Sequence, residues 1–284
     1  MNNLALRLLS AAILLPAVIS CFVFGGWWMT GLAIVAAAAS YFEFGAVVAK
    51  DDPVMRVALF VVGVAVTVIG IFVTGPATAL LTLQLAFVVM AVLTVLRASA
   101  DLQVDFRRLA ALVFSILWIA PGLISLVRLR ELGDAHTGTA TACYLMVCMV
   151  ATWANDTCAY FAGRFLGKHK MSGAISPKKT WEGFVGGAVG VPAFLLGGHL
   201  WFDMFAPLTW TDIAILALPI AVLGPVGDLV ESLWKRAYDI KDSGKLITGH
   251  GGMLDRMDAI FFVAPWVLVY FVGLKPWLAA QGLG

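Results

Sequence analysis

The chain has 284 residues, of which 61% are hydrophobic and only 13% are charged, and its formal net charge is +2. Soluble domains average about 25% charged residues, so this deficit excludes a water-soluble globular protein and leaves most of the surface facing lipid. Runs of about 20 apolar residues recur, whereas a transmembrane barrel would show short alternating segments. The composition therefore predicts an all-α polytopic membrane protein.

Nine stretches are long and apolar enough to cross a bilayer as helices. They cover residues 6–26, 28–49, 54–74, 76–96, 109–127, 139–161, 183–204, 211–233 and 259–279. We expect one integral membrane domain, 1–284, with scaffold spans in 1–138 and catalytic spans and cytoplasmic loops in 139–284. The first stretch also resembles a signal peptide ending at Cys21, but its apolar run continues through Phe24, which favours an uncleaved span.

The basic residues fall largely on one side of the membrane if the connections alternate and the N-terminus lies inside. Of the 19 Lys and Arg, only Arg128, Arg130 and Lys275 then lie outside. The positive-inside rule predicts a cytoplasmic N-terminus, an outer C-terminus and two long polar connections in the cytoplasm. We therefore expect a protein of the cytoplasmic (inner) membrane whose active site faces the cytoplasm. Because the basic residues follow this topology, nucleic-acid binding has no support.

Glu43 is an acid within the second predicted span, in the stretch SYFEFGAVV. An ionisable group inside a span is a functional candidate because an isolated charge there is costly. It could equally cap a helix or pair with a cation near the interface. Both interpretations stay open at the level of the sequence.

The first stretch that could carry chemistry runs from Trp153 to Phe184. Asp156 lies near the cytoplasmic end of the sixth span, and Tyr160 and Gly163 follow at i+4 and i+7 on the same helical face. The connection 164–181 contains five basic residues and no acid. Such a connection is suited to meet an anion.

Ser176 and Pro177 within this connection predict a helix N-cap and a first helical position. The free N–H groups of a helix N-terminus favour phosphate, and Lys178 and Lys179 would add positive charge. The alternative is a basic flank that obeys the positive-inside rule and holds anionic lipid headgroups.

The second stretch is GPVGDLVESLWKR, residues 224–236. Asp228, Glu231, Ser232 and Lys235 are spaced at i, i+3, i+4 and i+7, which places them on one face of a helix. A charge in the bilayer costs at least ~2.5 kcal/mol, so this face must line a wet cavity or hold an ion. A carboxylate pair beside a phosphate site is typical of Mg²⁺. The alternative is an ion pair with Lys235 that braces the helices.

The third stretch is KDSGKLITGHGGMLDRMD, residues 241–258. The glycines around His250 form a turn that lets backbone approach a ligand. Asp255 and Asp258 follow at the start of the last span, where capping would explain one acid but not both. These carboxylates and cations occur without a nucleophilic Ser or Cys set. They favour phosphoryl or nucleotidyl transfer driven by metal and electrostatics.

The 27 residues SLWKRAYDIKDSGKLITGHGGMLDRMD, 232–258, resemble the signature of the phosphatidate cytidylyltransferases, or CDP-diacylglycerol synthases. That signature is Ser-x-apolar-Lys-Arg, Lys-Asp and His-Gly-Gly-x-x-Asp-Arg-x-Asp. One departure is Thr248, where the family commonly has Pro. The upstream DTCAY and SPKKTWEG strings are similar to the family as well, so the detailed resemblance covers about 150–260.

The resemblance implies that CTP and phosphatidic acid give CDP-diacylglycerol and pyrophosphate with Mg²⁺, with room for a second, monovalent cation. It also implies contact with membrane lipids and a homodimer. For the metal it points to Asp228, Asp255 and Glu231; for catalysis also to Asp258, Lys235, Arg236 and His250; and for substrate binding to Ser176, Lys178, Lys179, Ser232, Lys241, Asp242, Arg256 and Asp156. We expect Asp255→Asn to abolish turnover without unfolding the protein.

Two other functions are compatible with parts of this pattern. A CTP-dependent kinase of a polyprenol-type lipid alcohol would share the nucleotide site but would need a base for a neutral hydroxyl. A membrane transporter could also keep charges in the bilayer, but transporters often show inverted repeats and broken helices in matching halves. Here the charges concentrate in one half and on one face, which argues against transport.

Overall fold

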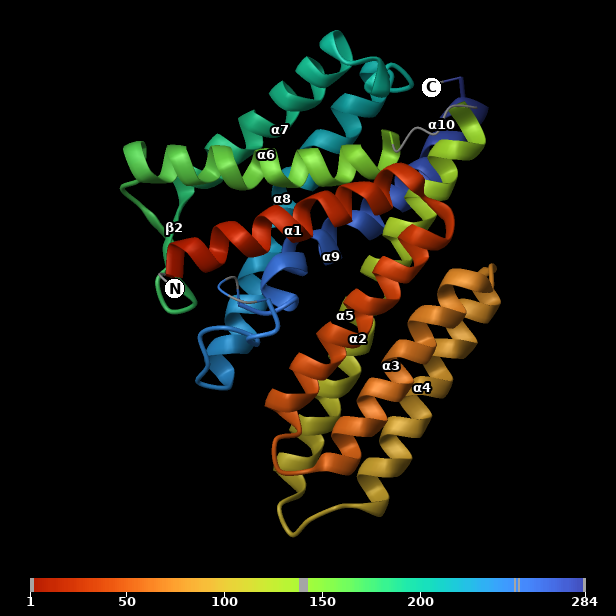
Figure 1. Cartoon of the computed structure of the whole chain (residues 1–284), viewed down its shortest axis with the longest axis vertical. Helices are drawn as coiled ribbons and strands as arrows, with labels where there is room; N and C mark the ends of the chain where they lie inside the picture. Colours follow the sequence, from red (N-terminus) through yellow and green to blue (C-terminus); the bar gives the residue numbers. More distant parts are fainter. Residues whose placement is uncertain (1–2, 138–142, 248, 250, 283–284) are drawn as a thin grey trace.

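The computed structural model describes residues 3–137, 143–247, 249 and 251–282, with the side chains of 3–11, 13 and 133–137 left out. The first half of the chain is a series of helices joined by short connections (Figure 1). These helices are α1 (Asn3–Phe24), α2 (Gly26–Val48), α3 (Pro53–Phe72), α4 (Pro76–Leu96) and α5 (Leu102–Thr137).

The second half adds longer polar connections and a small hairpin. Its elements are α6 (Cys143–Leu166), β1 (Lys170–Ser172), β2 (Ser176–Thr180), α7 (Trp181–Trp201), the 3₁₀ turn η1 (Asp203–Phe205), α8 (Trp210–Ala237), α9 (Leu254–Val269), the π-helical η2 (Tyr270–Leu274) and α10 (Lys275–Ala280). β1 and β2 pair antiparallel, with Lys170 opposite Thr180 and Ser172 opposite Ser176. The described residues are otherwise helical or irregular, which agrees with the predicted all-α class.

The first eight predicted spans overlap the helices α1 to α8 in order, and the ninth, 259–279, overlaps α9, η2 and α10. Within the described residues, seven helices are long and apolar enough to cross a membrane, which makes this an integral membrane protein. Those seven are α2, α3, α4, α5, α7, α8 and the continuous segment Leu254–Ala280. The described part of α1 contributes a shorter apolar helix, Leu14–Phe24. The α6 helix carries Asn155 and Asp156 in its second half.

The prediction that Ser176 and Pro177 begin a helix is wrong. Both residues lie in β2, and α7 begins five residues later, at Trp181. Thr180 is the N-cap, because its side-chain oxygen accepts a hydrogen bond from the Gly183 N–H at 3.2 Å. A Thr cap satisfies an otherwise unpaired N–H group of the first turn, whereas Pro177 is tolerated in a two-stranded hairpin, where both strands are edges.

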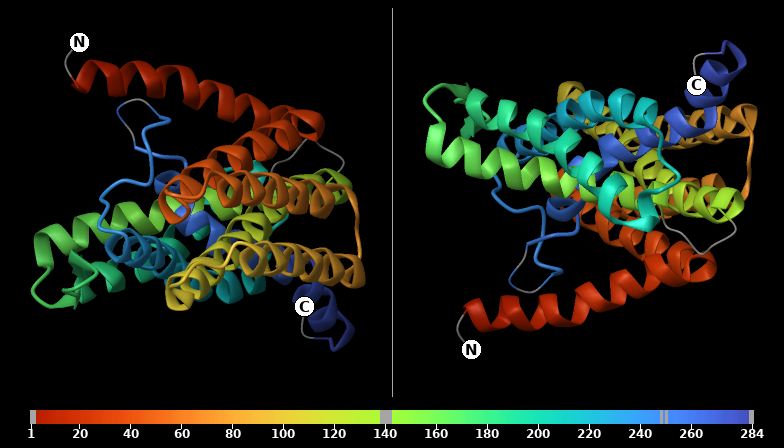
Figure 2. Two further views of the ribbon diagram at one scale, coloured as in Figure 1. Left: turned by 90° about the horizontal axis from the view of Figure 1, so that it is seen from below. Right: turned by 90° about the horizontal axis from the view of Figure 1, so that it is seen from above.

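The long helix α5 packs against α2, α3 and α4 of the first half and against α6 and α9 of the second half (Figure 1). α6 packs extensively against α7, and α8 packs against α9. An aromatic series joins four helices at the centre: the Trp234 ring stacks on Phe44 at 4.7 Å, and Phe114, Trp118 and Phe261 continue the series. Figure 2 shows α1 extending away from this bundle.

Candidate active site

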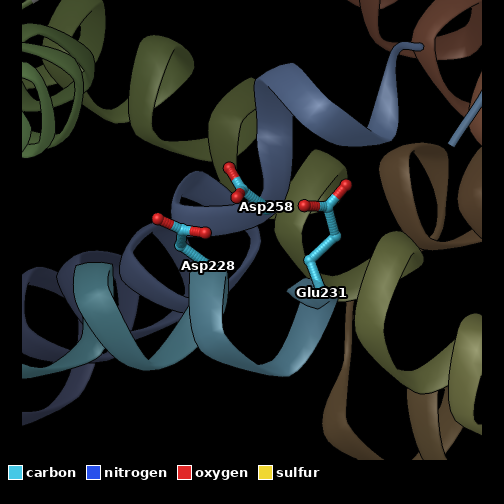
Figure 3. Close-up of side chains that lie close together, drawn as sticks. All are labelled: Asp228, Glu231 and Asp258. Carbon is cyan, nitrogen blue, oxygen red and sulfur yellow. The ribbon is translucent and has the colours of Figure 1, made fainter. Parts of the chain in front are cut away.

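Three carboxylates converge where α8 crosses α9. Asp228 and Glu231 come from α8 and Asp258 comes from α9, and one oxygen of each lies within 4.8 Å of the others (Figure 3). We call these three residues the acidic cluster. Gly227 permits the close crossing, because a Cβ atom there would lie 2.5 Å from the Asp258 carbonyl oxygen. The sequence analysis predicted the two α8 acids as metal ligands together with Asp255 of α9, whereas the structure brings Asp258 of α9 beside them.

The acidic cluster fits a divalent cation by its donor chemistry. Mg²⁺ prefers carboxylate oxygens and completes its shell with water and phosphate oxygens. Glu231 is 1% exposed, and its Oε1 atom is buried with no hydrogen-bond partner among the described residues. A buried carboxylate oxygen without a partner is costly. A bound cation would remove that cost.

Lys235 links the acidic cluster to the neighbouring Asp255. Its Nζ atom lies 2.5 Å from Glu231 Oε2 and 2.7 Å from Asp255 Oδ1, and the Lys235 side chain is 15% exposed. The alternative of an ion pair between an α8 acid and Lys235 is therefore present in the structure. It occupies one oxygen of Glu231 and leaves the other free for a metal.

Backbone and side-chain donors of neighbouring residues surround the Asp255 carboxylate. Its Oδ2 atom accepts from the Ser243 N–H at 2.9 Å and from the Gly252 N–H at 2.9 Å, and the Ser243 hydroxyl oxygen lies 3.0 Å away. Together with Lys235, these donors occupy both carboxylate oxygens. The role of Asp255 as a metal ligand stays a prediction, and the geometry places Asp258 beside Asp228 and Glu231 instead.

Lys179 brings the hairpin onto α8. Its Nζ atom lies 2.7 Å from Asp228 Oδ2 and donates to the Pro225 carbonyl oxygen at 3.1 Å. The residue predicted for phosphate binding is thus placed beside the acidic cluster, although it reaches this position from a strand and not from a helix N-terminus.

Two cavities meet at Asp156 and Asp228. The hairpin cavity, of about 540 Å³, lies between α6, β2, α7 and α8 and combines apolar walls with three cations, Arg164, Lys178 and Lys179. The loop cavity, of about 1040 Å³, lies under the connection from α8 to α9 and is lined by all of the acidic cluster together with Lys235, Asp242, Lys245, Asp255 and Arg256.

The remaining predicted residues fall into three groups. Ser232 donates to Asp228 Oδ1 at 3.5 Å, so it lies beside the cluster. Ser176, Arg236 and Lys241 line neither of the two cavities. His250 lies outside the described residues. Gly249 and Gly251 have positive φ angles, 78° and 85°, a conformation that favours glycine.

Sequence reasoning did not name Arg164, Lys245 and Glu43 as site residues. Arg164 follows Asp156 and Tyr160 at i+8 and i+4, and the Tyr160 hydroxyl lies 2.7 Å from the Arg164 Nη1 atom. That helical spacing was a usable signal. Glu43 was predicted to be either a functional acid or a residue that caps a helix or pairs with a cation. The structure brings it against the loop from α8 to α9.

Comparisons with known proteins agree with this geometry. The family model described as "Cytidylyltransferase family" matches residues 5–274. The chain is also similar to proteins named phosphatidate cytidylyltransferase. It is 43% identical to that of Bacillus subtilis (strain 168), over 45% of this chain and 46% of the relative. It is 36% identical to that of Staphylococcus saprophyticus, over 59% of this chain and 61% of the relative, and 40% identical to that of Brucella suis biovar 1, over 55% of this chain and 57% of the relative. The chain thus spans about half the length of the curated relatives it matches.

Proposed function

The chain belongs to the cytidylyltransferase family, and from this premise we propose that it transfers a cytidylyl group from CTP to phosphatidic acid. The products are CDP-diacylglycerol and pyrophosphate. The names of its relatives support this reaction. Because those similarities extend over about half of each relative, the activity and both substrates are proposals for this chain.

The observation that carries the proposal is the meeting of two unlike cavities at one acidic cluster. The loop cavity offers Lys235, Lys245 and Arg256 beside glycine backbone, which suits a triphosphate. The hairpin cavity offers apolar walls with cations near Asp156, which suits a lipid with a phosphate headgroup. A nucleotide and a lipid phosphate bound in these cavities would meet beside Asp228.

In the proposed reaction, an ionised phosphate oxygen of phosphatidic acid attacks the α-phosphorus of CTP. The bond from that phosphorus to the bridging oxygen of the β-phosphate breaks, and pyrophosphate leaves with the bonding electrons. The attacking oxygen carries no proton near neutral pH, so no strong base is required. The barrier is electrostatic, because one anion approaches another, and fixed cations lower it.

We assign the residues roles that follow from their positions. Asp228, Glu231 and Asp258 would hold Mg²⁺, which supplies charge neutralisation of the phosphates. Lys178, Lys179 and Arg164 would bind the lipid phosphate, and Lys245 and Arg256 the nucleotide phosphates. Asp255 would hold Lys235 and the loop in place. A second, monovalent cation has no assigned position.

We further propose that the site faces the cytoplasm across an inner membrane, with the N-terminus inside and the C-terminus outside. The distribution of Lys and Arg supports this orientation. The structure is compatible with it, since the end of α2, the end of α8 and the start of α9 lie together, as alternating spans require. Scaffold function in 1–138 and a homodimer also stay proposals.

The purified protein should be assayed with phosphatidic acid and a polyprenol in parallel, with and without Mg²⁺. CTP labelled at the α-phosphate or at the γ-phosphate separates the two lipid reactions. Cytidylyl transfer places the α-label in the lipid and releases the γ-label as pyrophosphate. Incorporation of the γ-label into the polyprenol would contradict the proposal and identify a lipid-alcohol kinase. Labelling of neither lipid would also contradict it.

A further inference from the structure

Glu43 is a buried acid of α2 that lies against the loop between α8 and α9, some 200 residues further along the chain. The residue is 3% exposed. It is five residues before Val48, the last residue of α2, which places it about 8 Å from that end along the helix axis at 1.5 Å per residue. A charge at this depth requires compensating donors.

The start of α9 supplies those donors. Glu43 Oε1 accepts from the Met253 N–H at 2.9 Å, and Oε2 accepts from the Leu254 N–H at 3.1 Å. Met253 is the N-cap of α9 and makes no capping hydrogen bond through its own side chain. A helix N-terminus has unpaired N–H groups that a side-chain oxygen usually satisfies locally. Here a residue of another helix performs this task.

The Glu43 carboxylate is also connected to the acidic cluster through other side chains. Glu43 Oε2 also accepts from the Ser243 hydroxyl at 3.2 Å, and that hydroxyl lies 3.0 Å from Asp255. Asp255 in turn contacts Lys235, which contacts Glu231 of the acidic cluster. A continuous series of polar contacts therefore runs from α2 to the proposed metal ligands.

Two glycines of the loop fit around the Glu43 carboxylate. A Cβ atom at Gly244 would lie 2.5 Å from Glu43 Oε1, and one at Gly252 would lie 2.5 Å from Oε2. The loop thus encloses this carboxylate at both of its ends. The next residue, Phe44, stacks on Trp234 of α8 with ring centroids 4.7 Å apart, which fixes α2 against the helix that carries Asp228 and Glu231.

We propose that Glu43 is a positioning residue for the nucleotide side of the site: it holds residues 243–247 and 251–254 over the loop cavity and sets the start of α9. It contacts neither proposed substrate. The proposal rests on the proposed cytidylyl transfer only for its kinetic consequences. Its structural consequences can be measured without any activity.

The test compares Glu43→Gln with Glu131→Gln, the same change at an exposed acid near the end of α5. The amide introduced by Glu43→Gln would turn an NH₂ group toward a backbone donor. Hydrogen exchange of the backbone amides in 243–254 should therefore speed up about tenfold or more, while amides in α3 and α4 keep their rates. The Glu131→Gln variant should exchange like the parent. Unchanged exchange in 243–254 of Glu43→Gln would overturn the proposal.

The kinetic arm separates positioning from general loss of structure. Turnover at a fixed, subsaturating CTP concentration should fall about 100-fold, as expected when reacting groups are misplaced by about 1 Å. The KM for CTP should rise while the KM for phosphatidic acid stays unchanged, because only the loop cavity is disturbed. An equal rise in both values would overturn the proposal. If the parent forms no CDP-diacylglycerol, the proposed function fails, and the exchange experiment still decides the role of Glu43.

A second variant keeps the test open if Glu43→Gln does not fold. Ser243→Ala removes the hydroxyl between Glu43 and Asp255 but leaves both carboxylates in place. It should also speed exchange of the amides in 243–254 and raise the KM for CTP. If it matches the parent in both measurements, the inferred connection between Glu43 and the site is wrong.

Discussion

Lys235→Met removes the one amine that two carboxylates share. Lys235 Nζ lies 2.5 Å from Glu231 and 2.7 Å from Asp255, and the side chains of the three residues are 15%, 2% and 10% exposed. Met has a similar length and apolar stem, so packing is largely kept. Removing one partner of a buried ion pair costs about 3–5 kcal/mol. Because Lys235 is partly exposed, we take the lower limit, about 3 kcal/mol, which is about a 100-fold change in the unfolding equilibrium.

The assay is reversible unfolding of the purified protein in mixed detergent micelles, followed by circular dichroism. Lys241→Met, at an exposed lysine outside both cavities, should stay within about 0.5 kcal/mol of the parent. Adding Glu231→Gln to Lys235→Met should restore part of the lost stability, because one of the two carboxylates that lost the amine is then neutral. A Lys235→Met protein whose free energy of unfolding lies within about 0.5 kcal/mol of the parent would refute the interpretation that Lys235 forms a stabilising buried ion pair with Glu231 and Asp255.

Two further changes test other parts of the structure. Gly227→Ala should separate Asp228 from Asp258 and lower turnover without altering any charge. The control Gly31→Ala, where a Cβ atom meets nothing within 4 Å, should leave turnover unchanged. Equal activities of the two variants in a labelled-CTP assay would contradict the proposed α8–α9 site. Burial raises the pKa of Asp52, but hydrogen bonds from Arg97 and the Met55 N–H outweigh it and leave that pKa below its ordinary value. The resulting stabilisation is complete above the unfolded-state pKa of about 3.9 and is lost as the pH falls below it. Asp52→Asn, which keeps a capping oxygen, should therefore lose stability at neutral pH and converge with the parent in acid unfolding curves; a constant difference down to about pH 2 would be inconsistent with this.

The helices were predictable because their signal is local. Runs of apolar residues predict α1 to α9, and the first residues of α3 and α4 are Pro53 and Pro76, a position where Pro is favoured. The hairpin was not predicted, since Ser176-Pro177 has the local chemistry of a helix start as well as that of an edge strand. The helix starts later because Thr180, four residues after Ser176, caps α7.

The acids of the site were predictable as a set, but their grouping was not. Asp255 and Asp258 are three residues apart on α9 and share one helical face. Which of them meets Asp228 is decided by the crossing of α8 and α9 at Gly227, and the sequence contains no local signal for that crossing. Asp255 instead turns toward Ser243 and Lys235.

The contacts of Glu43 were likewise not predictable from the sequence. Its burial was visible in the sequence as an acid within an apolar run. Its partners are backbone N–H groups of Met253 and Leu254, which no pattern of side chains reveals. Only the packing of α2 beside the start of α9 distinguishes a cap from a catalytic acid.

The central claim is that the acidic cluster holds the metal for cytidylyl transfer. The most direct measurement is the Mg²⁺ concentration that gives half-maximal CDP-diacylglycerol formation by Asp258→Asn, beside Asp203→Asn as a control at an exposed acid of η1. We predict that Asp258→Asn requires about tenfold more Mg²⁺ or is inactive at any concentration, while Asp203→Asn titrates like the parent. An Asp258→Asn protein with the Mg²⁺ requirement and the turnover of the parent would contradict the account.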